Sequence, residues 1–278
     1  MPDKKERFLE AVRRLDGLCC PVCGEALRPA DDGLRCENRH CVNVSCRGTV
    51  NVLSAARTDA YDSALFAARR RVFAAGCYQA VAEAVEALLP EGPQRLLDAG
   101  CGEGWYLNTL LTRHPDWCGA GVDISREGIR MAAGYPCAAV WCVADLKRLP
   151  FRDGCFTAVL DVLTPADYAE FRRVLAPGGL LVKVFPGPEY LRELREARGL
   201  PLYEAGTVET WLQGHARVLA TRRIHQTVSV SPAVWADFVR MTPLNQDLDA
   251  DALDTLCKKQ AAAVTIDLTA AACIPAQK

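Results

Sequence analysis

Long hydrophobic runs are missing from this chain of 278 residues, although 50% of the residues are hydrophobic. A membrane-spanning helix needs about 20 consecutive apolar residues, so no membrane partner is expected. Residues 1–15 carry charges throughout and lack the apolar segment of a secretory signal peptide. We therefore expect a cytoplasmic protein.

An excess of charge of one sign is also missing, because 33 Lys and Arg residues nearly balance 34 Asp and Glu residues. The net charge of −1 excludes a free basic tail and a uniformly basic surface. It leaves a nucleic-acid partner open, because a local basic patch is enough to bind nucleic acid. Internal repeats and low-complexity segments are absent too, so an ordinary globular chain is expected.

Cysteine, by contrast, is abundant, with 14 residues in the chain. A disulfide scaffold would be a short secreted chain, which this is not. We expect reduced thiols, and most of them should act as small buried hydrophobic side chains. This group includes Cys118, Cys142 and Cys155.

Four residues near the N-terminus follow the spacing Cys-x2-Cys-x12-Cys-x3-His. They are Cys20, Cys23, Cys36 and His40. Three thiolates and one imidazole provide the four tetrahedral ligands that zinc prefers, and a site filled by four protein ligands is structural. Cys19 and Cys41 stand next to two of these residues and remain alternative ligands. The spacing predicts a small zinc-binding domain over residues 1–53, with His40 favoured as the fourth ligand.

From Ser63 onward the chain alternates helix-like and strand-like segments, which is typical of an α/β domain. Helices are predicted at residues 63–75, 78–89 and 233–241. Short apolar runs suited to buried parallel strands cover residues 95–98, 118–123, 139–143, 157–163 and 180–185. Two further strands are predicted at residues 221–231 and 262–270. We therefore predict a seven-stranded α/β sheet over residues 54–278.

A glycine-rich turn follows the first predicted strand, which ends at Asp98. Its glycines, at positions 100, 102 and 104, allow positive φ and a close approach of a ligand to the backbone. Their G-x-G-x-G spacing differs from the G-x-G-x-x-G of dinucleotide-binding proteins. Asp123 ends the second strand, where an acid accepts hydrogen bonds from ribose hydroxyls. Asp145 follows the third strand, where a carboxylate would accept from an adenine amino group.

The order of these motifs, with the turn at residues 175–179, resembles that of class I S-adenosylmethionine (SAM) methyltransferases. For Asp98 and Asp145 a structural role as turn or helix caps stays open. Trp105 and Tyr106 would stack on a base or adenine, or would pack the following helix against the sheet. The residues predicted to bind the cofactor are Asp98, Gly100, Gly102, Gly104, Tyr106, Asp123, Ile124, Asp145 and Leu146.

Nearly the whole chain resembles the RlmA family, bacterial enzymes that methylate guanine N1 in a hairpin loop of 23S ribosomal RNA. The matching segments are the Cys/His pattern of residues 20–40, Gly48–Leu53, Ala68–Arg70, Ala75–Gln79, Pro186–Pro188 and Met241–Pro243. The resemblance implies a class I, Rossmann-like methyltransferase fold, SAM and Zn²⁺ as cofactors, and a 23S ribosomal RNA hairpin as partner. It also implies a homodimer.

Two positions depart from the family pattern near the expected target base. The family has Ala-Pro followed by Cys or Arg after the fourth strand, whereas this chain has Leu163-Thr164-Pro165-Ala166, and Thr157 replaces an acid within that strand. The residues assigned to catalysis are Asp161, Thr164 and Pro165. Asp161 and Asp167 are the candidate general bases for the guanine N1 proton. Asp161 faces either the cleft or solvent, and Thr164 and Pro165 would shape the pocket.

These departures leave other functions open. The chain would act on a different RNA base or a small molecule, or would be a non-catalytic SAM-binding protein associated with RNA. Two sets of arginines are candidate RNA contacts or simply solvated surfaces. They are Arg35, Arg39 and Arg47 in the predicted zinc-binding domain, and Arg69, Arg70 and Arg71 on the first predicted helix.

Overall fold

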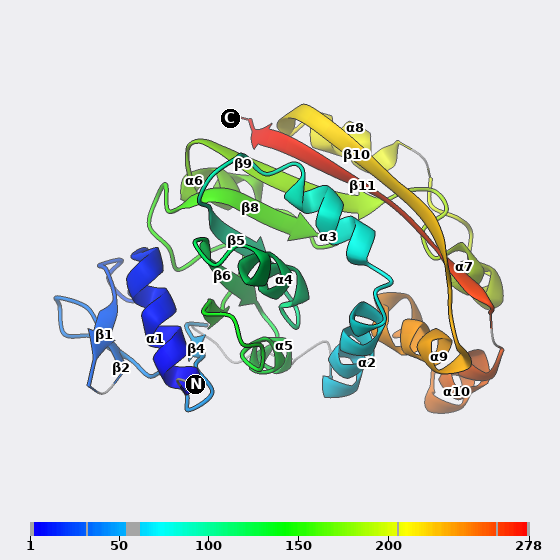
Figure 1. Ribbon diagram of the computed structural model, residues 1–278, viewed down its shortest axis with the longest axis horizontal. Helices are drawn as coiled ribbons and strands as arrows, with labels where there is room; N and C mark the ends of the chain where they lie inside the picture. The colour runs from blue at the N-terminus through cyan, green and yellow to red at the C-terminus, as the bar shows by residue number, and fades with distance from the viewer. Residues whose placement is uncertain (1–2, 32, 54–61, 205, 260, 277–278) are drawn as a thin grey trace.

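The computed structural model of the chain describes residues 3–31, 33–53, 62–204, 206–259 and 261–276. Its centre is a sheet of eight strands in the order β10-β11-β9-β8-β5-β6-β7-β4 (Figure 1). Six neighbouring strands, from β9 to β4, are parallel, and β11 is antiparallel to both β9 and β10. The predicted α/β sheet is therefore confirmed, with β4 as an additional edge strand.

The sheet strands differ in length, and the last three are the longest. They are β4 (Val50–Asn51), β5 (Arg95–Ala99), β6 (Cys118–Asp123), β7 (Val140–Val143), β8 (Phe156–Val162), β9 (Leu175–Pro186), β10 (Ala216–Ser229) and β11 (Ala263–Pro275). The predicted strands at 221–231 and 262–270 were too short, because β10 and β11 stay paired from Ala216 opposite Pro275 to Ser229 opposite Ala263. The first residues of β10, Ala216–Ala220, are mostly apolar but do not alternate with polar residues, so they lack the pattern of a half-exposed strand.

Helices bury side chains on both faces of the sheet, in two separate clusters. Successive strand residues such as Leu96 and Leu97 belong to opposite clusters, as the alternation of side chains along a strand requires. One cluster includes α2 (Ser63–Ala74), α3 (Gln79–Glu86), α4 (Trp105–Arg113), α5 (Arg126–Ala132), α7 (Arg192–Arg198), α9 (Pro232–Met241) and α10 (Ala250–Lys258). The other includes α1 (Lys4–Leu15), α6 (Tyr168–Val174) and α8 (Thr207–Gln213). None of the helices in the described residues has the length and apolar character of a membrane span.

The N-terminal segment shares its core with the sheet. Strand β4 pairs in parallel with β7, with Val50 opposite Cys142. The buried side chains of Phe8, Val12 and Leu15 on α1 belong to the same cluster as the inner residues of β6 and β7. A small antiparallel sheet of β1 (Arg28–Ala30), β2 (Gly33–Arg35) and β3 (Cys41–Val42) lies beyond α1. The predicted boundary between residues 53 and 54 borders residues outside the described part and stays a prediction.

This shared core predicts how the N-terminal segment unfolds. Phe8 is 1% exposed within the common cluster, so Phe8→Ala is expected to lower the free energy of unfolding by about 3–5 kcal/mol. Urea denaturation followed by circular dichroism should shift as one transition for the whole chain. Val22→Ala is the matched control, because Val22 is 69% exposed. An unchanged sheet transition in Phe8→Ala would show that the two parts unfold independently.

Candidate active site and candidate metal site

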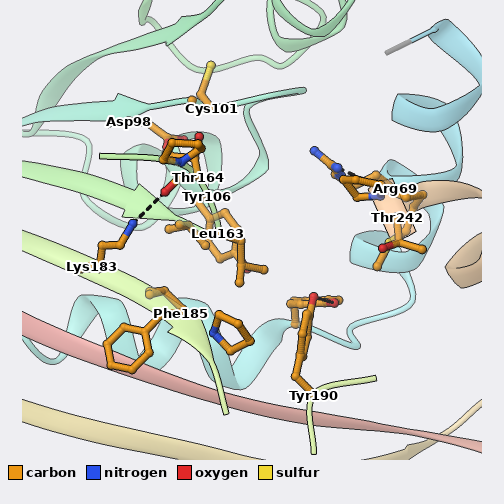
Figure 2. Close-up of a pocket in the computed structure, with 18 of the residues that line it drawn as sticks. Arg69, Asp98, Cys101, Tyr106, Leu163, Thr164, Lys183, Phe185, Tyr190 and Thr242 are labelled. Carbon is orange, nitrogen blue, oxygen red and sulfur yellow. Dashed lines mark hydrogen bonds between the residues drawn. The ribbon is translucent and has the colours of Figure 1, made fainter. Parts of the chain in front are cut away.

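A cavity of about 600 Å³ opens where β5, β8 and β9 end at their carboxyl edges. In Figure 2, Asp98, Cys101 and Thr164 lie on one side of it, and Arg69 and Thr242 lie across from them. Aromatic side chains form much of the wall: Phe66, Phe73, Tyr78, Tyr106, Phe185, Tyr190 and Tyr203. Carboxyl edges of parallel strands are the usual ligand site of open α/β sheets, so the cavity is the candidate active site.

The glycine loop after β5 has the geometry of a cradle. Gly100, Gly102 and Gly104 all have positive φ, of 74°, 54° and 82°. A Cβ atom on Gly100 would lie 2.5 Å from the hydroxyl oxygen of Thr164, and one on Gly104 would lie 2.7 Å from the Trp141 ring. Larger residues would therefore strain the turn and clash with these two neighbours.

Asp123, at the end of β6, lies in the cavity wall and also supports the glycine loop. Its two carboxylate oxygens accept hydrogen bonds from the backbone amides of Gly102 and Ser125, each at 2.8 Å. Burial raises the pKa of this carboxyl, and the two amides oppose the rise. Each oxygen keeps a further lone pair for a ligand hydroxyl.

Asp98 and Tyr106 present polar atoms that lack a partner among the described residues. Asp98 Oδ2 and the Tyr106 hydroxyl are both buried and make no hydrogen bond, and both residues line the cavity. Burial, helped by the neighbouring acids Asp123 and Glu103, raises the pKa of Asp98 to about 7. A buried polar atom without a partner costs stability, so these two atoms indicate a ligand with hydrogen-bonding groups.

Tyr106 also contributes to the packing of α4. Its ring meets those of Phe73 and Trp105 edge to face, at centroid distances of 5.6 and 4.9 Å. Trp105 stacks on Phe73 at 4.8 Å and is not part of the cavity wall. Trp105 therefore takes the packing role, whereas Tyr106 combines packing with an open hydroxyl.

Five of the predicted cofactor residues stand beside the cavity rather than in its wall: Gly102, Gly104, Ile124, Asp145 and Leu146. Ile124 follows Asp123, and Asp145 and Leu146 follow β7, whose Val143 pairs with Asp123. The Asp145 carboxylate accepts a hydrogen bond from the Lys147 amide at 3.0 Å, which is the turn-capping role left open above. A ligand reaching beyond Asp123 would meet this segment.

The predicted catalytic residues form one connected unit. Lys183 on β9 donates hydrogen bonds to Asp161 Oδ2 at 2.8 Å and to the carbonyl oxygen of Thr164 at 2.7 Å (Figure 2). Leu163, Thr164 and Pro165 all line the cavity, and Leu163, the first residue after β8, has a positive φ of 56°. Lys183 therefore fixes the segment that follows β8 across the end of this strand.

Asp161 has neither of the two orientations that the sequence left open. The solvated orientation is wrong, because the residue is 0% exposed, and its side chain is also absent from the cavity wall. Burial raises its pKa to about 6, and Lys183 opposes the rise. Asp167, the other candidate base, caps α6 by accepting a hydrogen bond from the Glu170 amide at 3.0 Å. Strand alternation alone could not reveal the ion pair with Lys183.

Several segments quoted for the family resemblance meet at the cavity. Arg69, Tyr78, Pro186 and the run 241–243 all line it. Arg69 donates a hydrogen bond to the Met241 carbonyl at 3.2 Å, which ties α2 to the end of α9. Lys183, Tyr190 and Tyr203 also line the cavity but were not predicted. Lys183 lies within the fifth parallel strand and the two tyrosines follow it, and only the Pro186–Pro188 segment before Tyr190 marked this stretch of the sequence.

The arginine run on α2 is largely engaged within the chain. Arg70 pairs with the buried carboxylate of Glu103 at 3.2 Å, and Arg71 pairs with Asp237 at 2.6 Å. Glu103 belongs to the glycine loop, so Arg70 ties that loop to α2. Among these three arginines, Arg69 is the one that reaches the cavity.

The second candidate site lies in the N-terminal segment. The ligand atoms of Cys20, Cys23, Cys36 and His40 all lie within 4.8 Å of one another. The Cys23 and Cys36 sulfurs are 3.7 Å apart, and His40 Nδ1 is 3.3 to 3.7 Å from the three sulfurs. A tetrahedron with metal–sulfur bonds of about 2.3 Å has sulfur–sulfur edges of about 3.8 Å, so the four residues fit one tetrahedral ion. Cys19 and Cys41 are not part of this cluster.

The cluster is joined to the loop that follows β7. The Cys19 amide donates to the Pro150 carbonyl at 2.8 Å, and the Arg152 amide donates to the Gly17 carbonyl at 3.0 Å. Leu18 forms an isolated antiparallel bridge with Phe151. The segment that carries the first two cysteines therefore rests on the loop that begins at Asp145.

Sequence comparisons extend these observations to known proteins. Residues 96–179 match a family model described as a methyltransferase domain. A 23S rRNA (guanine(748)-N(1))-methyltransferase of Streptomyces fradiae is 33% identical, over 85% of this chain and 88% of its own. The YxjB protein of Bacillus subtilis (strain 168), a proposed 23S rRNA (guanine-N(1))-methyltransferase, is 32% identical, over 90% of this chain and 94% of its own.

A solved structure shares the fold at low sequence identity. The methyltransferase in the Haloferax volcanii complex with the Trm112 activator superposes with a TM-score of 0.50 at 16% identity, covering 77% of this chain and 95% of that chain. At this identity the likeness concerns the fold alone. Together with the sheet order, it confirms the predicted class I methyltransferase fold.

The raised pKa of Asp98 predicts a pH-dependent cost to stability. Its folded pKa of about 7 lies above the reference value of 3.8, so the folded state loses stability as the pH rises from about 4 to about 7. Asp98→Asn should therefore stabilise the unliganded chain, and the gain should grow by roughly 4 kcal/mol between pH 4 and pH 8. Thermal denaturation across this range measures the difference. A gain of equal size at every pH would mean that Asp98 does not titrate in this window.

Proposed function

The chain belongs to the RlmA-like family of 23S rRNA (guanine-N1)-methyltransferases, and from this premise we propose that it methylates N1 of a guanine in a hairpin loop of large-subunit ribosomal RNA. It is a SAM-dependent methyltransferase. The observation that carries the proposal is the single cavity in which the glycine loop and Asp123 face the segment 163–165. Such a substrate places the activity in the cytoplasm.

The residues of the cavity fit the cofactor. The positive-φ glycines leave room for its methionine part, and Asp123 has lone pairs free for the ribose hydroxyls. The unpartnered Asp98 Oδ2 would accept a hydrogen bond from the ammonium group, and that positive charge would lower the pKa of Asp98 again. Tyr106, Ile124, Asp145 and Leu146 would border the adenosine part. When bound, the cofactor supplies an electrophilic methyl group on a sulfonium.

The predicted catalytic residues act by positioning. Guanine N1 carries a proton at neutral pH, so methylation would form a bond from N1 to the methyl carbon, break the bond from that carbon to sulfur and release the N1 proton to water. Lys183, which is paired with Asp161, donates to the Thr164 carbonyl, and this fixes Thr164 against Gly100 and leaves Pro165 at the cavity. This arrangement sets where the base enters, and orientation of two reactants is itself a large source of rate.

The cluster of Cys20, Cys23, Cys36 and His40 is proposed to hold one structural Zn²⁺. Sulfur-rich tetrahedral ligand sets favour zinc over calcium or magnesium, and all four positions are taken by protein. Bound zinc would stabilise a segment whose strands are only two or three residues long. We propose that this segment grips the RNA, with its arginines contacting phosphates outside the cavity. Among the residues that the structure describes, the cavity wall contains two cationic residues, Arg69 and Lys183.

The proposal predicts methyl transfer to naked large-subunit ribosomal RNA that lacks its own modifications. Radiolabelled SAM should label this RNA, and mass spectrometry should identify 1-methylguanosine. Asp123→Ala should weaken cofactor affinity about tenfold or more by calorimetry, because hydrogen bonds to a buried carboxylate are lost. The exposed Asp116→Ala is the matched control and should change nothing.

The outcomes of this experiment separate the candidate functions. Labelling at another base would replace guanine N1 as the target while keeping the enzyme class. Cofactor binding without transfer to any RNA would contradict the proposal and favour a small-molecule substrate or a non-catalytic role. Unchanged cofactor affinity in Asp123→Ala would contradict the ribose assignment.

The metal assignment predicts about one zinc ion per chain by plasma mass spectrometry. Cys36→Ser and His40→Ala should each lose most of the zinc and lower the melting temperature. Cys41→Ser is the matched control, since Cys41 is exposed and its thiol points to the Arg39 carbonyl at 3.7 Å. Zinc loss in Cys41→Ser with retention in His40→Ala would reverse the choice of the fourth ligand.

A further inference from the structure

We propose that three stacked rings beside the cavity form a platform for an unpaired nucleobase of the RNA substrate. This aromatic stack consists of Trp211, His215 and Tyr168. The inference rests on the proposed RNA substrate and assigns to it a contact away from the reacting base. The ligand would be the flat π face of a base that flanks the target guanine.

The geometry of the stack is that of parallel rings. Trp211 and His215 have centroids 4.2 Å apart and planes 28° apart. His215 and Tyr168 have centroids 5.1 Å apart and planes 26° apart. His215 Nδ1 hydrogen-bonds the Trp211 carbonyl at 2.8 Å, which fixes the imidazole against the end of α8. Trp211 stays 61% exposed although one of its faces meets His215.

The fold of α8 does not need Trp211. The helix is anchored by Leu212, which is 1% exposed and belongs to the core cluster on that face of the sheet. The indole of Trp211 adds little to that anchor, because most of its surface stays in water. An exposed tryptophan alone carries no meaning, since scattered apolar side chains are common on protein surfaces. Its stacking partners and its place are what point to a ligand.

The stack continues from the wall of the cavity. Val208 lines the cavity and stands one helical turn before Trp211 on α8, where side chains three residues apart are neighbours. On the other helix, Tyr168 begins α6 three residues after Pro165, which also lines the cavity. The same two chain segments thus build the cavity wall and the stack. Figure 1 places α6 and α8 behind the sheet, on the side opposite α3.

Five large hydrophobic side chains are exposed in the described residues, and three of them belong to segments that form the cavity. The five are Val22, Leu163, Leu202, Trp211 and Leu219. Leu163 lines the cavity, Leu202 precedes the lining residue Tyr203, and Trp211 follows Val208. A ligand that is larger than the cavity would therefore extend over the segments that carry these three side chains.

A nucleobase is the occupant that this chemistry favours. Aromatic side chains bind unpaired bases by stacking, and hairpin loops present such bases next to the one that is turned out. Arg172 stands four residues after Tyr168 on α6, and its guanidinium donates to the Ala276 carbonyl, while the Ala276 amide donates to the His215 carbonyl. A cation beside stacked rings is the combination that single-stranded nucleic acid requires, since each base brings a phosphate.

The test compares wild-type protein with Trp211→Ala, Trp211→Phe and Leu219→Ala, using a hairpin of large-subunit ribosomal RNA and SAM. Trp211→Ala should raise KM for RNA about five- to hundredfold, with kcat and cofactor affinity unchanged. Trp211→Phe should restore most of the affinity, because a ring remains. Leu219→Ala, a change at a 45% exposed residue on β10, should match wild type.

Fluorescence provides a readout that does not depend on turnover. Among the five tryptophans, Trp117, Trp141 and Trp235 are buried, and Trp105 is stacked on Phe73. RNA binding should therefore quench a component that is lost in Trp211→Ala. An RNA hairpin with an abasic site at one loop position should no longer quench the fluorescence of wild type. Its KM with wild type should equal the KM of Trp211→Ala with the intact hairpin.

Each result decides the proposal. Equal RNA affinity in wild type and Trp211→Ala, by KM or by titration, overturns the platform even when wild type methylates RNA. A change in molar mass of Trp211→Ala by light scattering, without a change in RNA affinity, assigns the surface to a protein interface and also overturns it. Failure of wild type to transfer methyl, with Trp211-dependent RNA quenching intact, overturns the proposed reaction and keeps the platform.

Discussion

The buried ion pair between Lys183 and Asp161 is the interaction on which the shape of the active site depends. It lies where β8 and β9 end, and the same ammonium group also binds the Thr164 carbonyl. Removing one partner of a buried pair costs about 3–5 kcal/mol, because the other charge is left unpaired. The segment that crosses the strand ends contains Leu163 with positive φ, a conformation that a leucine adopts only under constraint. Lys183 supplies that constraint, and through Thr164 it also determines how the glycine loop is covered.

The sequence predicted the parts of this fold that depend on local pattern. Apolar runs located all five central strands, and Gly100, Gly102 and Gly104 located the turn, because positive φ favours glycine there. The Cys and His spacing selected the four residues that converge, because a tetrahedral cluster joins two short turns. The class of enzyme followed from motifs in a fixed order.

Features that depend on contacts between distant segments were beyond sequence reasoning. The partner of Asp161 is 22 residues away on the next strand, and nothing near Lys183 marks it as an ion-pair residue. The pairing of β4 with β7 involves two residues of each strand, which are too few to show an alternation of apolar and polar side chains. The full length of β10 was also missed, because residues 216–220 do not alternate between apolar and polar side chains. The aromatic stack joins α6 to the end of α8 and has no sequence signal.

The attachment of the N-terminal segment has a consequence for protein engineering. The turn that carries the first two cysteines rests on residues 150–152, and that loop leads back to the segment expected to border adenosine. Strand β4 and helix α1 complete the same core. A chimera that exchanges only residues 1–53 between relatives would join a foreign turn to a resident loop and a foreign helix to a resident sheet. The transplantable unit is discontinuous, and a functional exchange has to carry the loop after β7 together with the N-terminal segment.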